Sequence, residues 1–139
     1  VLEVRSGPVS ALLTADVDSL VEIALAIDRP LALLKAGHHG SSSSSGATWL
    51  ARVRPAVALI SAGERNVYGH PSPQVLERLA RSGARIDRTD REGALWYEMS
   101  DSGIHRVDWR RADPPAGTRE ALRPRAVSGS PAVSAPRFR

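Results

Sequence analysis

The 139-residue sequence contains no cysteine and no long hydrophobic run. Without cysteine, disulfide bonds and metal sites built on thiolates are excluded. No apolar stretch approaches the roughly 20 residues that a membrane-spanning helix needs, and the first residues do not have the pattern of a secretory signal peptide. Internal repeats are absent as well, and the length is that of one modest domain.

The net charge of the chain is +4, but residues 1–105 have no excess of positive charge. Residues 106–139 contain 8 arginines and 3 acidic residues, which leaves 11 of the 19 basic and 12 of the 15 acidic residues for positions 1–105. The first 105 residues therefore lack the composition of a basic nucleic-acid platform.

The end of the chain differs in composition from the rest. From residue 110 onward it is rich in Pro, Gly, Ser and Arg and loses apolar periodicity, which predicts a segment without a packed core. We expect a folded domain at residues 1–111 and a disordered tail at 112–139. The arginines of this tail suit DNA or anionic lipid, but such tails are also found as simple solvated ends, and we assign it no mechanism.

The polar stretch that begins at Gly37 has the strongest pattern of a functional site. A short apolar run, residues 31–34, is followed by His38 and His39 between two glycines and then by five serines at 41–45. A buried strand that ends in this way delivers its imidazoles to a cleft, and two neutral imidazoles suit Zn²⁺, Mn²⁺ or Fe²⁺. The alternative is a polar loop whose histidines only form hydrogen bonds. The serines favour a mobile loop that lines the cleft, with hydroxyls able to donate to phosphate oxygens, over a flexible linker.

Two further strands are expected to end in polar residues. Residues 11–15 form an apolar run that ends at Asp16, and residues 57–61 precede a loop that carries Asn66, Tyr68 and His70. Strand ends separated by helix-length crossovers lie at one edge of a sheet, so these groups are expected to converge. Asp16 is the best ligand candidate, although it could instead cap the following helix. For His70, fixing the loop is the structural alternative to a chemical role.

The remaining pattern predicts a mixed α and β fold. Strands 1–5 and 9–14 form a hairpin, Asp18 and Ser19 cap a helix over 20–27, and Leu20, Ile23, Ala24 and Ile27 are spaced to face the sheet. Ser72 and Pro73 begin a second clear helix that Gly83 ends. Residues 94–99 and 104–109 read as a closing hairpin, where His105 is structural or exposed.

These stretches resemble the metallo-β-lactamase-type domain of the ComEC family of bacterial competence and DNA-internalisation proteins. The resemblance rests on LLTAD (12–16), LLKAGHHGS (33–41), RPAVALISAG (54–63), NVYGHPSPQVLERL (66–79) and RTDREGAL (88–95), and it covers residues 1–100. It implies an α+β fold, namely the C-terminal half of an αββα sandwich, with a mixed sheet, flanking helices and a terminal hairpin. Ala15 stands where the family usually has glycine, which we expect to be harmless.

The resemblance also assigns roles to the candidate residues. It implies a site for two divalent metal ions, Zn or Mn, in which Asp16 bridges the metals, His38 is the last histidine ligand and His70 assists catalysis. The residues expected to orient a ligand or to contact substrate are His39, Ser41, Asn66 and Tyr68. DNA, single- or double-stranded, is the substrate that the resemblance implies.

The family's HxHxDH or HxDxDH motif is expected before Asp16 and is absent from the sequence. We therefore expect a C-terminal fragment that binds metal weakly or not at all and is inactive alone. Its partners would be the missing N-terminal half and the membrane-channel domain of the same protein, located in the bacterial inner membrane. The alternatives are a soluble hydrolase of a small-molecule ester, lactone or thioester, and a non-catalytic remnant.

Overall fold

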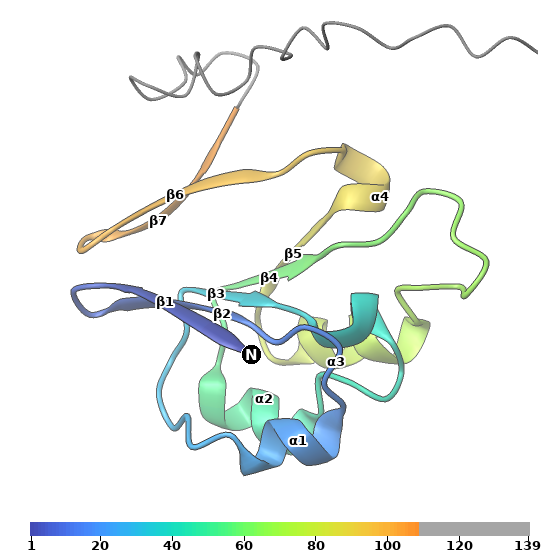
Figure 1. The fold of residues 1–139 in the computed structure, drawn as a ribbon, viewed down its shortest axis with the longest axis horizontal. Helices are drawn as coiled ribbons and strands as arrows, with labels where there is room; N and C mark the ends of the chain where they lie inside the picture. The colour runs from blue at the N-terminus through green and yellow to red at the C-terminus, as the bar shows by residue number, and fades with distance from the viewer. Residues whose placement is uncertain (109–139) are drawn as a thin grey trace, which may run out of the picture.

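A five-stranded mixed sheet forms the centre of the molecule. The structure is a computed structural model that describes residues 1–108 (Figure 1). The sheet has the order β1-β2-β3-β4-β5, in which β1 pairs antiparallel with β2 and the other neighbours are parallel. The strands are β1 (Leu2–Ser6), β2 (Val9–Leu13), β3 (Leu33–Lys35), β4 (Val57–Ile60) and β5 (Arg85–Arg88).

Helices cover one face of this sheet and a hairpin covers part of the other. The order of the strands across the sheet is their order in the sequence. Right-handed crossovers between the parallel strands of such a sheet place every connecting helix on the same side. Figure 1 shows the three helices α1 (Ser19–Ala24), α2 (Ala47–Val53) and α3 (Pro73–Arg81) below the sheet. The hairpin of β6 (Trp96–Ser100) and β7 (Gly103–Val107) lies above it and follows the single turn α4 (Thr89–Glu92).

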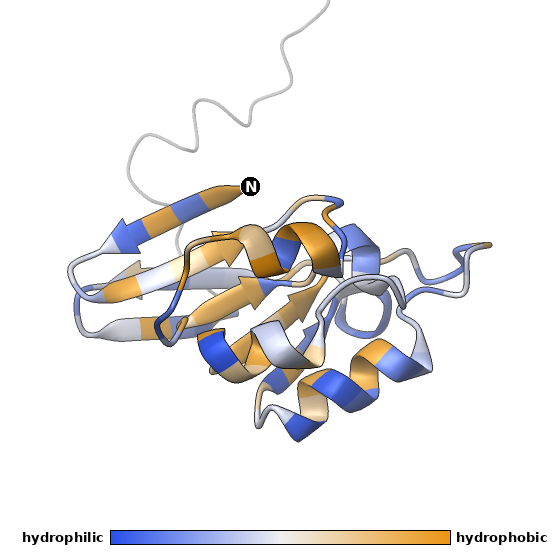
Figure 2. Ribbon diagram, turned by 90° about the horizontal axis from the view of Figure 1, so that it is seen from below, coloured by the Kyte–Doolittle hydropathy of each residue, from blue (hydrophilic) through white to orange (hydrophobic). Residues whose placement is uncertain are grey.

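The main hydrophobic core lies between the sheet and the three helices. Its largest fully buried side chains include Trp49 from α2, Leu34 from β3, Ile60 from β4 and Leu79 from α3. Figure 2, which views the molecule from below, shows central strands that are largely hydrophobic, whereas β1 alternates between hydrophobic and hydrophilic residues. A second, smaller core joins the hairpin to the opposite face of the sheet.

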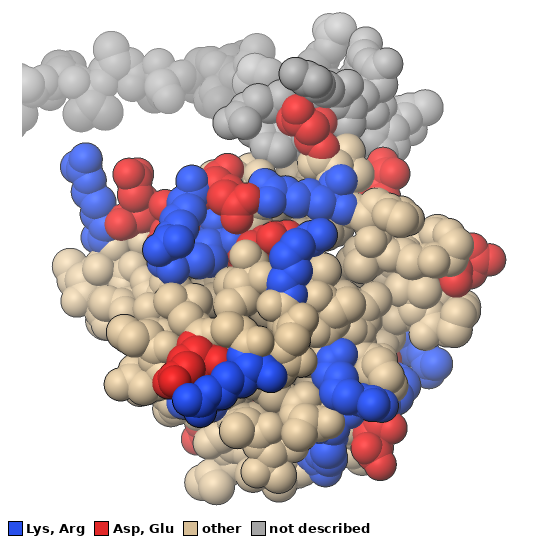
Figure 3. All heavy atoms as spheres, turned by 180° about the vertical axis from the view of Figure 1, so that it is seen from behind, with Lys and Arg blue, Asp and Glu red and all other residues tan. Residues whose placement is uncertain are grey.

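A buried carboxylate anchors the hairpin to β5. Asp87 accepts a hydrogen bond from the hydroxyl of Tyr97 at 2.5 Å and from Arg85 at 2.9 Å. Burial acts to raise the pKa of Asp87, but the hydrogen bonds from Tyr97 and Arg85 outweigh it, so that the pKa lies below its usual value. Burial and the contact with Asp87 raise the pKa of Tyr97 to about 12. Figure 3 shows basic and acidic side chains interleaved on one face of the molecule.

Most of the expected elements are confirmed. Both hairpins form, and Asp18 caps α1 by accepting hydrogen bonds from the backbone N–H groups of Leu20 and Val21. Ser72 caps α3, Pro73 is its first residue, and Gly83 follows its end with φ of +83°. The mixed sheet with flanking helices and a terminal hairpin is therefore confirmed, and it is compatible with the expected α+β class.

The predicted buried face of the first helix is wrong for Leu20, Ile23 and Ala24, whereas Ile27, which follows the end of α1, is partly buried against the main core. The side chains of Leu20 and Ile23 are 77% and 49% exposed, Ala24 is also exposed, and Glu22 is fully buried. The helix is only six residues long, and the Glu22 carboxylate accepts hydrogen bonds from the backbone N–H groups of Ser45 at 2.7 Å and Gly46 at 2.9 Å. Burial raises the pKa of Glu22 in spite of these hydrogen bonds.

The serine run is also different from the expected cleft-lining loop. Ser44 and Ser45 are fully buried, and the Ser44 hydroxyl donates to the carbonyl of Gly37 at 2.8 Å. The guanidinium of Arg78 donates to the carbonyls of Ser42, Ser44 and Ser45 at 2.8–2.9 Å. The prediction of a mobile loop lining a cleft is therefore wrong for Ser44 and Ser45, which connect the turn after β3 with α1 and α3.

Two expectations concern parts of the protein outside this description. The predicted domain boundary at residue 111 and the predicted tail at 112–139 lie beyond residues 1–108 and stay predictions. Within residues 1–108, no helix is long and apolar enough to cross a membrane.

Candidate functional site

Three loops meet at the edge of the sheet where β2, β3 and β4 end. Asp16 follows β2, His38 and His39 lie in a short 3-10 turn (Gly37–Gly40) after β3, and His70 lies in the loop between β4 and α3. Because these three strands are parallel neighbours, their carboxyl ends meet at one edge. The sequence expectation that these groups share one edge is therefore confirmed.

Backbone contacts connect the three loops. The N–H of His38 donates to the carbonyl of Ala15, and the N–H of Ser72 donates to the carbonyl of Gly40, both at 2.8 Å. A Cβ atom on Gly40 would lie 2.6 Å from the Cβ of Pro71, and one on Gly37 would lie 2.8 Å from the carbonyl of Val17. Both glycines are thus required by close approach of the neighbouring loops.

Three non-glycine residues at this edge have left-handed backbone conformations. The φ angles are +55° for Ala15, +48° for His38 and +54° for His39. Each such residue costs about 1–2 kcal/mol relative to the right-handed region. Strain of this kind clusters at binding and catalytic sites, where the surrounding structure holds it in place. Glycine adopts the left-handed conformation of Ala15 without this strain.

The imidazole of His39 is oriented by the protein. Its Nδ1 lies 2.7 Å from the carbonyl of Ser61, which can only accept, so Nδ1 carries the proton in the neutral ring. The lone pair is then on Nε2, which lies 3.8 Å from Oδ1 of Asp16. Two ligands bound to one zinc ion at about 2.0–2.1 Å can be at most about 4.2 Å apart, so this spacing fits a shared metal. A carbonyl that fixes the tautomer of a histidine is a normal part of metal sites.

His38 and His70 form the second part of the site. Their ring centroids are 5.9 Å apart, and the ring of His38 is 6.5 Å from that of His39. The Nδ1 atom of His70 is buried and has no hydrogen-bond partner among the described residues. A buried imidazole nitrogen without a partner is costly, which is consistent with a missing ligand at this place.

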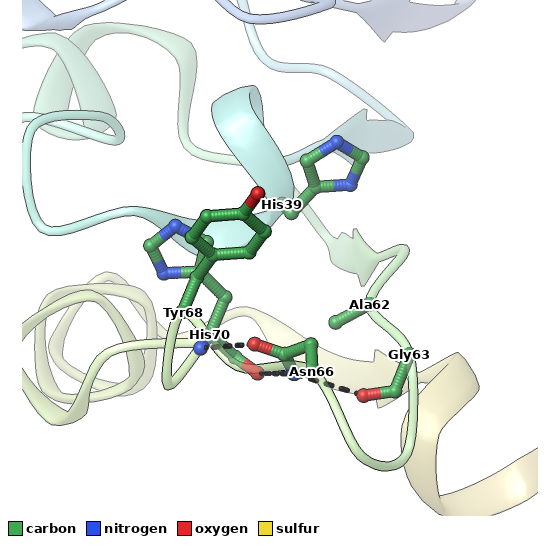
Figure 4. Close-up of a pocket in the computed structure, with 6 residues that line it drawn as sticks. All are labelled: His39, Ala62, Gly63, Asn66, Tyr68 and His70. Carbon is green, nitrogen blue, oxygen red and sulfur yellow. Dashed lines mark hydrogen bonds between the residues drawn. The ribbon is translucent and has the colours of Figure 1, made fainter.

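A pocket of about 200 Å³ lies beside these histidines. Figure 4 shows its lining residues, with Tyr68 lying over His70. The lining residues are His39, Ala62, Gly63, Asn66, Tyr68 and His70.

Two residues expected to contact substrate are engaged within the protein. The amide of Asn66 donates to the carbonyls of Gly63 and His70 at 2.8 and 2.7 Å, and its oxygen accepts from the N–H of His70 at 2.8 Å. The hydroxyl of Ser41 lies 3.0 Å from that of Ser43. The hydrogen bonds of Asn66 therefore stabilise the conformation of the loop. The contact of Asn66 and Ser41 with substrate stays a prediction.

The described residues supply only part of a metal site. Within residues 1–108, no group of three or more His, Cys, Asp or Glu side chains is placed to hold a metal ion. Asp16 and His39 approach each other, whereas a tightly bound zinc needs three or four protein ligands. The carboxylate and imidazole groups are suitable ligands for a divalent metal, but there are too few of them for tight binding. The fourth histidine, His105, is exposed on β7 and lies outside the site.

One residue that supports the site was not singled out from the sequence. The Thr89 hydroxyl accepts from the N–H of Ala62 and donates to its carbonyl, both at 2.9 Å. It thereby fixes the first residues of the loop that carries His70. Thr89 lies in the RTDREGAL stretch, so its place in that motif was the only available signal.

Comparison with known proteins identifies relatives of the chain. It is 36% identical over 104 residues to ComE operon protein 3 of Bacillus subtilis, a match that covers 73% of this chain and 13% of the relative. It is 35% identical over 108 residues to competence protein ComA of Neisseria gonorrhoeae, covering 75% and 16%. The chain is related to bacterial competence proteins. A further relative is recombination protein 2 of Haemophilus influenzae, 38% identical over 98 residues, covering 68% of this chain and 12% of the relative.

The competence relation concerns a small segment of much longer proteins. The chain spans about one eighth to one sixth of the length of these relatives. No family model and no solved structure matches it. The part of the resemblance that names the competence family is thus supported, and the metallo-β-lactamase assignment stays a prediction.

Proposed function

We propose that this chain is part of a metal-dependent hydrolase domain of a DNA-uptake protein and that the domain acts on nucleic-acid phosphodiesters. In this proposal the domain is the C-terminal half of a metallo-β-lactamase-type αββα sandwich. The parent protein lies in the bacterial inner membrane, with the N-terminal half and the channel domain as partners. The relation to competence proteins supports the biological setting.

One observation carries the chemical part of the proposal. The Asp16 carboxylate and the oriented Nε2 of His39 lie 3.8 Å apart at the ends of two adjacent parallel strands. Next to them, His70 has a buried nitrogen that lacks a partner. A carboxylate, an imidazole of fixed tautomer and a further imidazole are what a metal-assisted hydrolase needs from these loops.

The role of each side chain follows from its placement. Asp16 would hold a metal ion and, with two ions bound, would be the ligand that both share. His39 is favoured as the imidazole ligand by its bond to Ser61, whereas the family resemblance favours His38, and the two assignments differ in a measurable way. His70 is positioned to donate a proton or a hydrogen bond to a phosphate or leaving oxygen.

The metal contributes chemistry that these side chains cannot supply. When bound, Zn²⁺ or Mn²⁺ lowers the pKa of a coordinated water and neutralises negative charge on phosphate oxygens. The remaining ligands would come from the N-terminal half of the proposed domain, since the described residues provide too few. The 139-residue chain alone is therefore expected to bind metal weakly and to lack cleavage activity.

The proposal is tested by DNA cleavage in the longer protein context in which the relatives carry this segment. Metal-dependent cleavage with Mn²⁺ or Zn²⁺ is expected, and Asp16→Asn should abolish it. His39→Ala should lower metal content and activity by about 100-fold or more if it is a ligand, and only about 10–100-fold if it orients one. His38→Ala, measured beside it, decides between the two histidines. His105→Ala is the matched control and should behave as the wild type.

The contrary outcomes are equally specific. Cleavage that survives Asp16→Asn at full rate would refute the metal mechanism. Hydrolysis of lactone or thioester substrates without any cleavage of DNA would assign the domain to small-molecule hydrolysis. A longer protein that neither binds metal nor hydrolyses any of these substrates would show a non-catalytic remnant.

A further inference from the structure

Tyr68 is an exposed aromatic residue at the edge of the candidate site. Its side chain is 78% exposed, although the whole chain has only 4% aromatic residues. The loop that carries it follows β4 and extends beyond the sheet, shown in green in Figure 1. The ring lies over the imidazole of His70 with a centroid distance of 6.1 Å and an interplanar angle of 22° (Figure 4).

The protein holds the loop that carries this ring pair in place before any ligand binds. The three hydrogen bonds of Asn66 close the loop around residues 66–70, and two of them hold the backbone of His70 directly. On the other side of the loop, Pro71 packs closely against Gly40. A group that binds to a preformed surface does not have to order that surface, which favours affinity.

The adjoining pocket has the size of one ring system. Its volume is about 200 Å³, whereas pockets for drug-sized ligands are about 300–1,000 Å³. Ala62 and Gly63 give it an apolar side, and the imidazole of His39 lies at its wall. A flat heteroaromatic ring could lie against Tyr68 with its polar edge toward the imidazoles.

We propose that Tyr68, supported by His70, is a stacking platform for one nucleobase next to the phosphodiester that the site acts on. The proposal rests on the proposed function for the identity of the ligand as nucleic acid, but it concerns binding and not cleavage. Stacking on an aromatic face tolerates any base sequence and requires that the base be unpaired. The preferred substrate is therefore single-stranded nucleic acid or the frayed end of a duplex.

The test measures binding by the 139-residue chain, so it does not depend on catalysis. Single-stranded oligonucleotides that contain 2-aminopurine report stacking through quenching of its fluorescence. Measurements at about 150 mM salt reduce electrostatic binding by the arginines of residues 106–139. Tyr68→Ala should weaken binding about 5- to 150-fold, which corresponds to the loss of one stacked base, and should abolish the quenching.

Matched variants separate stacking from a change in the loop. Tyr68→Phe keeps the aromatic ring and should bind like the wild type. Val67→Ala changes the neighbouring residue, which is 90% exposed and not aromatic, and should have no effect. An oligonucleotide with abasic positions should bind to the wild type as weakly as the normal oligonucleotide binds to Tyr68→Ala. Thermal melting of each variant verifies that the fold is intact.

The outcomes distinguish this proposal from the proposed function. Equal binding by Tyr68→Ala and the wild type, or no binding of single strands at any accessible concentration, would overturn the platform. If the longer protein cleaves DNA and Tyr68→Ala does not alter its affinity, the platform fails and the hydrolase proposal stands. Tyr68-dependent stacking in a protein that never cleaves DNA would leave the platform standing and reject the hydrolase.

Discussion

Replacing Gly40 by alanine tests whether the close approach of two loops builds the site. Gly40 has φ of +81°, so any side chain there is strained by about 1–2 kcal/mol. The new Cβ would also lie 2.6 Å from the Cβ of Pro71 and 3.3 Å from the Cγ2 of Ile60. Overpacking of this kind costs about 1–3 kcal/mol. The expected loss in the free energy of unfolding is therefore about 2–5 kcal/mol.

Gly83→Ala is a matched control for this substitution. Gly83 has nearly the same φ, +83°, but a Cβ atom there would meet nothing within 4 Å. Its loss should be confined to the backbone strain of about 1–2 kcal/mol. The difference between the two variants thus isolates the contact between the histidine turn and Pro71.

Urea denaturation followed by circular dichroism gives both free energies. In a domain of about 100 residues each kcal/mol lowers the melting temperature by about 4–8 °C, so thermal melting offers a second measurement. Gly40→Ala should also weaken binding of metal and of single-stranded oligonucleotide, because it separates the turn that carries His39 from the loop that carries His70. Equal losses for the two variants, or unchanged ligand binding by a folded Gly40→Ala protein, would refute this account of the site.

Three other substitutions test the supporting structure by urea denaturation. Arg78→Leu removes three hydrogen bonds to carbonyls of the serine run and should lower the free energy of unfolding by about 2–4 kcal/mol. The control is Arg81→Leu, which changes an exposed arginine of the same helix and should cost less than about 0.5 kcal/mol. Similar losses for the two variants would contradict a supporting role for Arg78. Tyr97→Phe should cost about 1–3 kcal/mol at pH 7 through its bond to Asp87. Folding lowers the pKa of Asp87, so the stability that this carboxylate contributes is present above its unfolded pKa of about 3.9 and is lost as the pH falls through the folded pKa. The effect of Tyr97→Phe on the free energy of unfolding should therefore shrink at pH 3. A constant effect would argue against the hydrogen bond between Tyr97 and the ionised Asp87 as its cause. Ala15→Gly should stabilise the protein by up to about 1 kcal/mol, because relief of left-handed strain exceeds the added freedom of the unfolded chain; a marked loss of stability would contradict this.

Local rules of sequence predicted the parts of the fold that depend on a few neighbouring residues. Ser72 and Pro73 mark the start of α3 because a cap needs only its own side chain and the next turn. The convergence of Asp16 with the histidines followed from strand order alone, since parallel strands end at one edge.

Features that depend on distant partners were not predictable in this way. Glu22 can be buried because its carboxylate accepts hydrogen bonds from backbone N–H groups more than 20 residues away, and no periodicity in α1 indicates that. The left-handed conformation of His38 and His39 arises from the contacts that surround the turn, because neither residue type requires it. For the same reason the sequence could not show which imidazole faces Asp16.

The order of the strands also bears on how the chain folds. Every strand of the main sheet pairs with its immediate predecessor in the sequence, so no pairing has to wait for a segment from the far end. Three of these pairings are parallel, so each must close a crossover before it forms, and this makes the sheet slower to fold than a helical bundle with local contacts. The pairings of this sheet can nevertheless form in chain order from the hairpin of β1 and β2 onward while the ribosome is still adding residues, and the hairpin of β6 and β7 closes over the sheet afterwards.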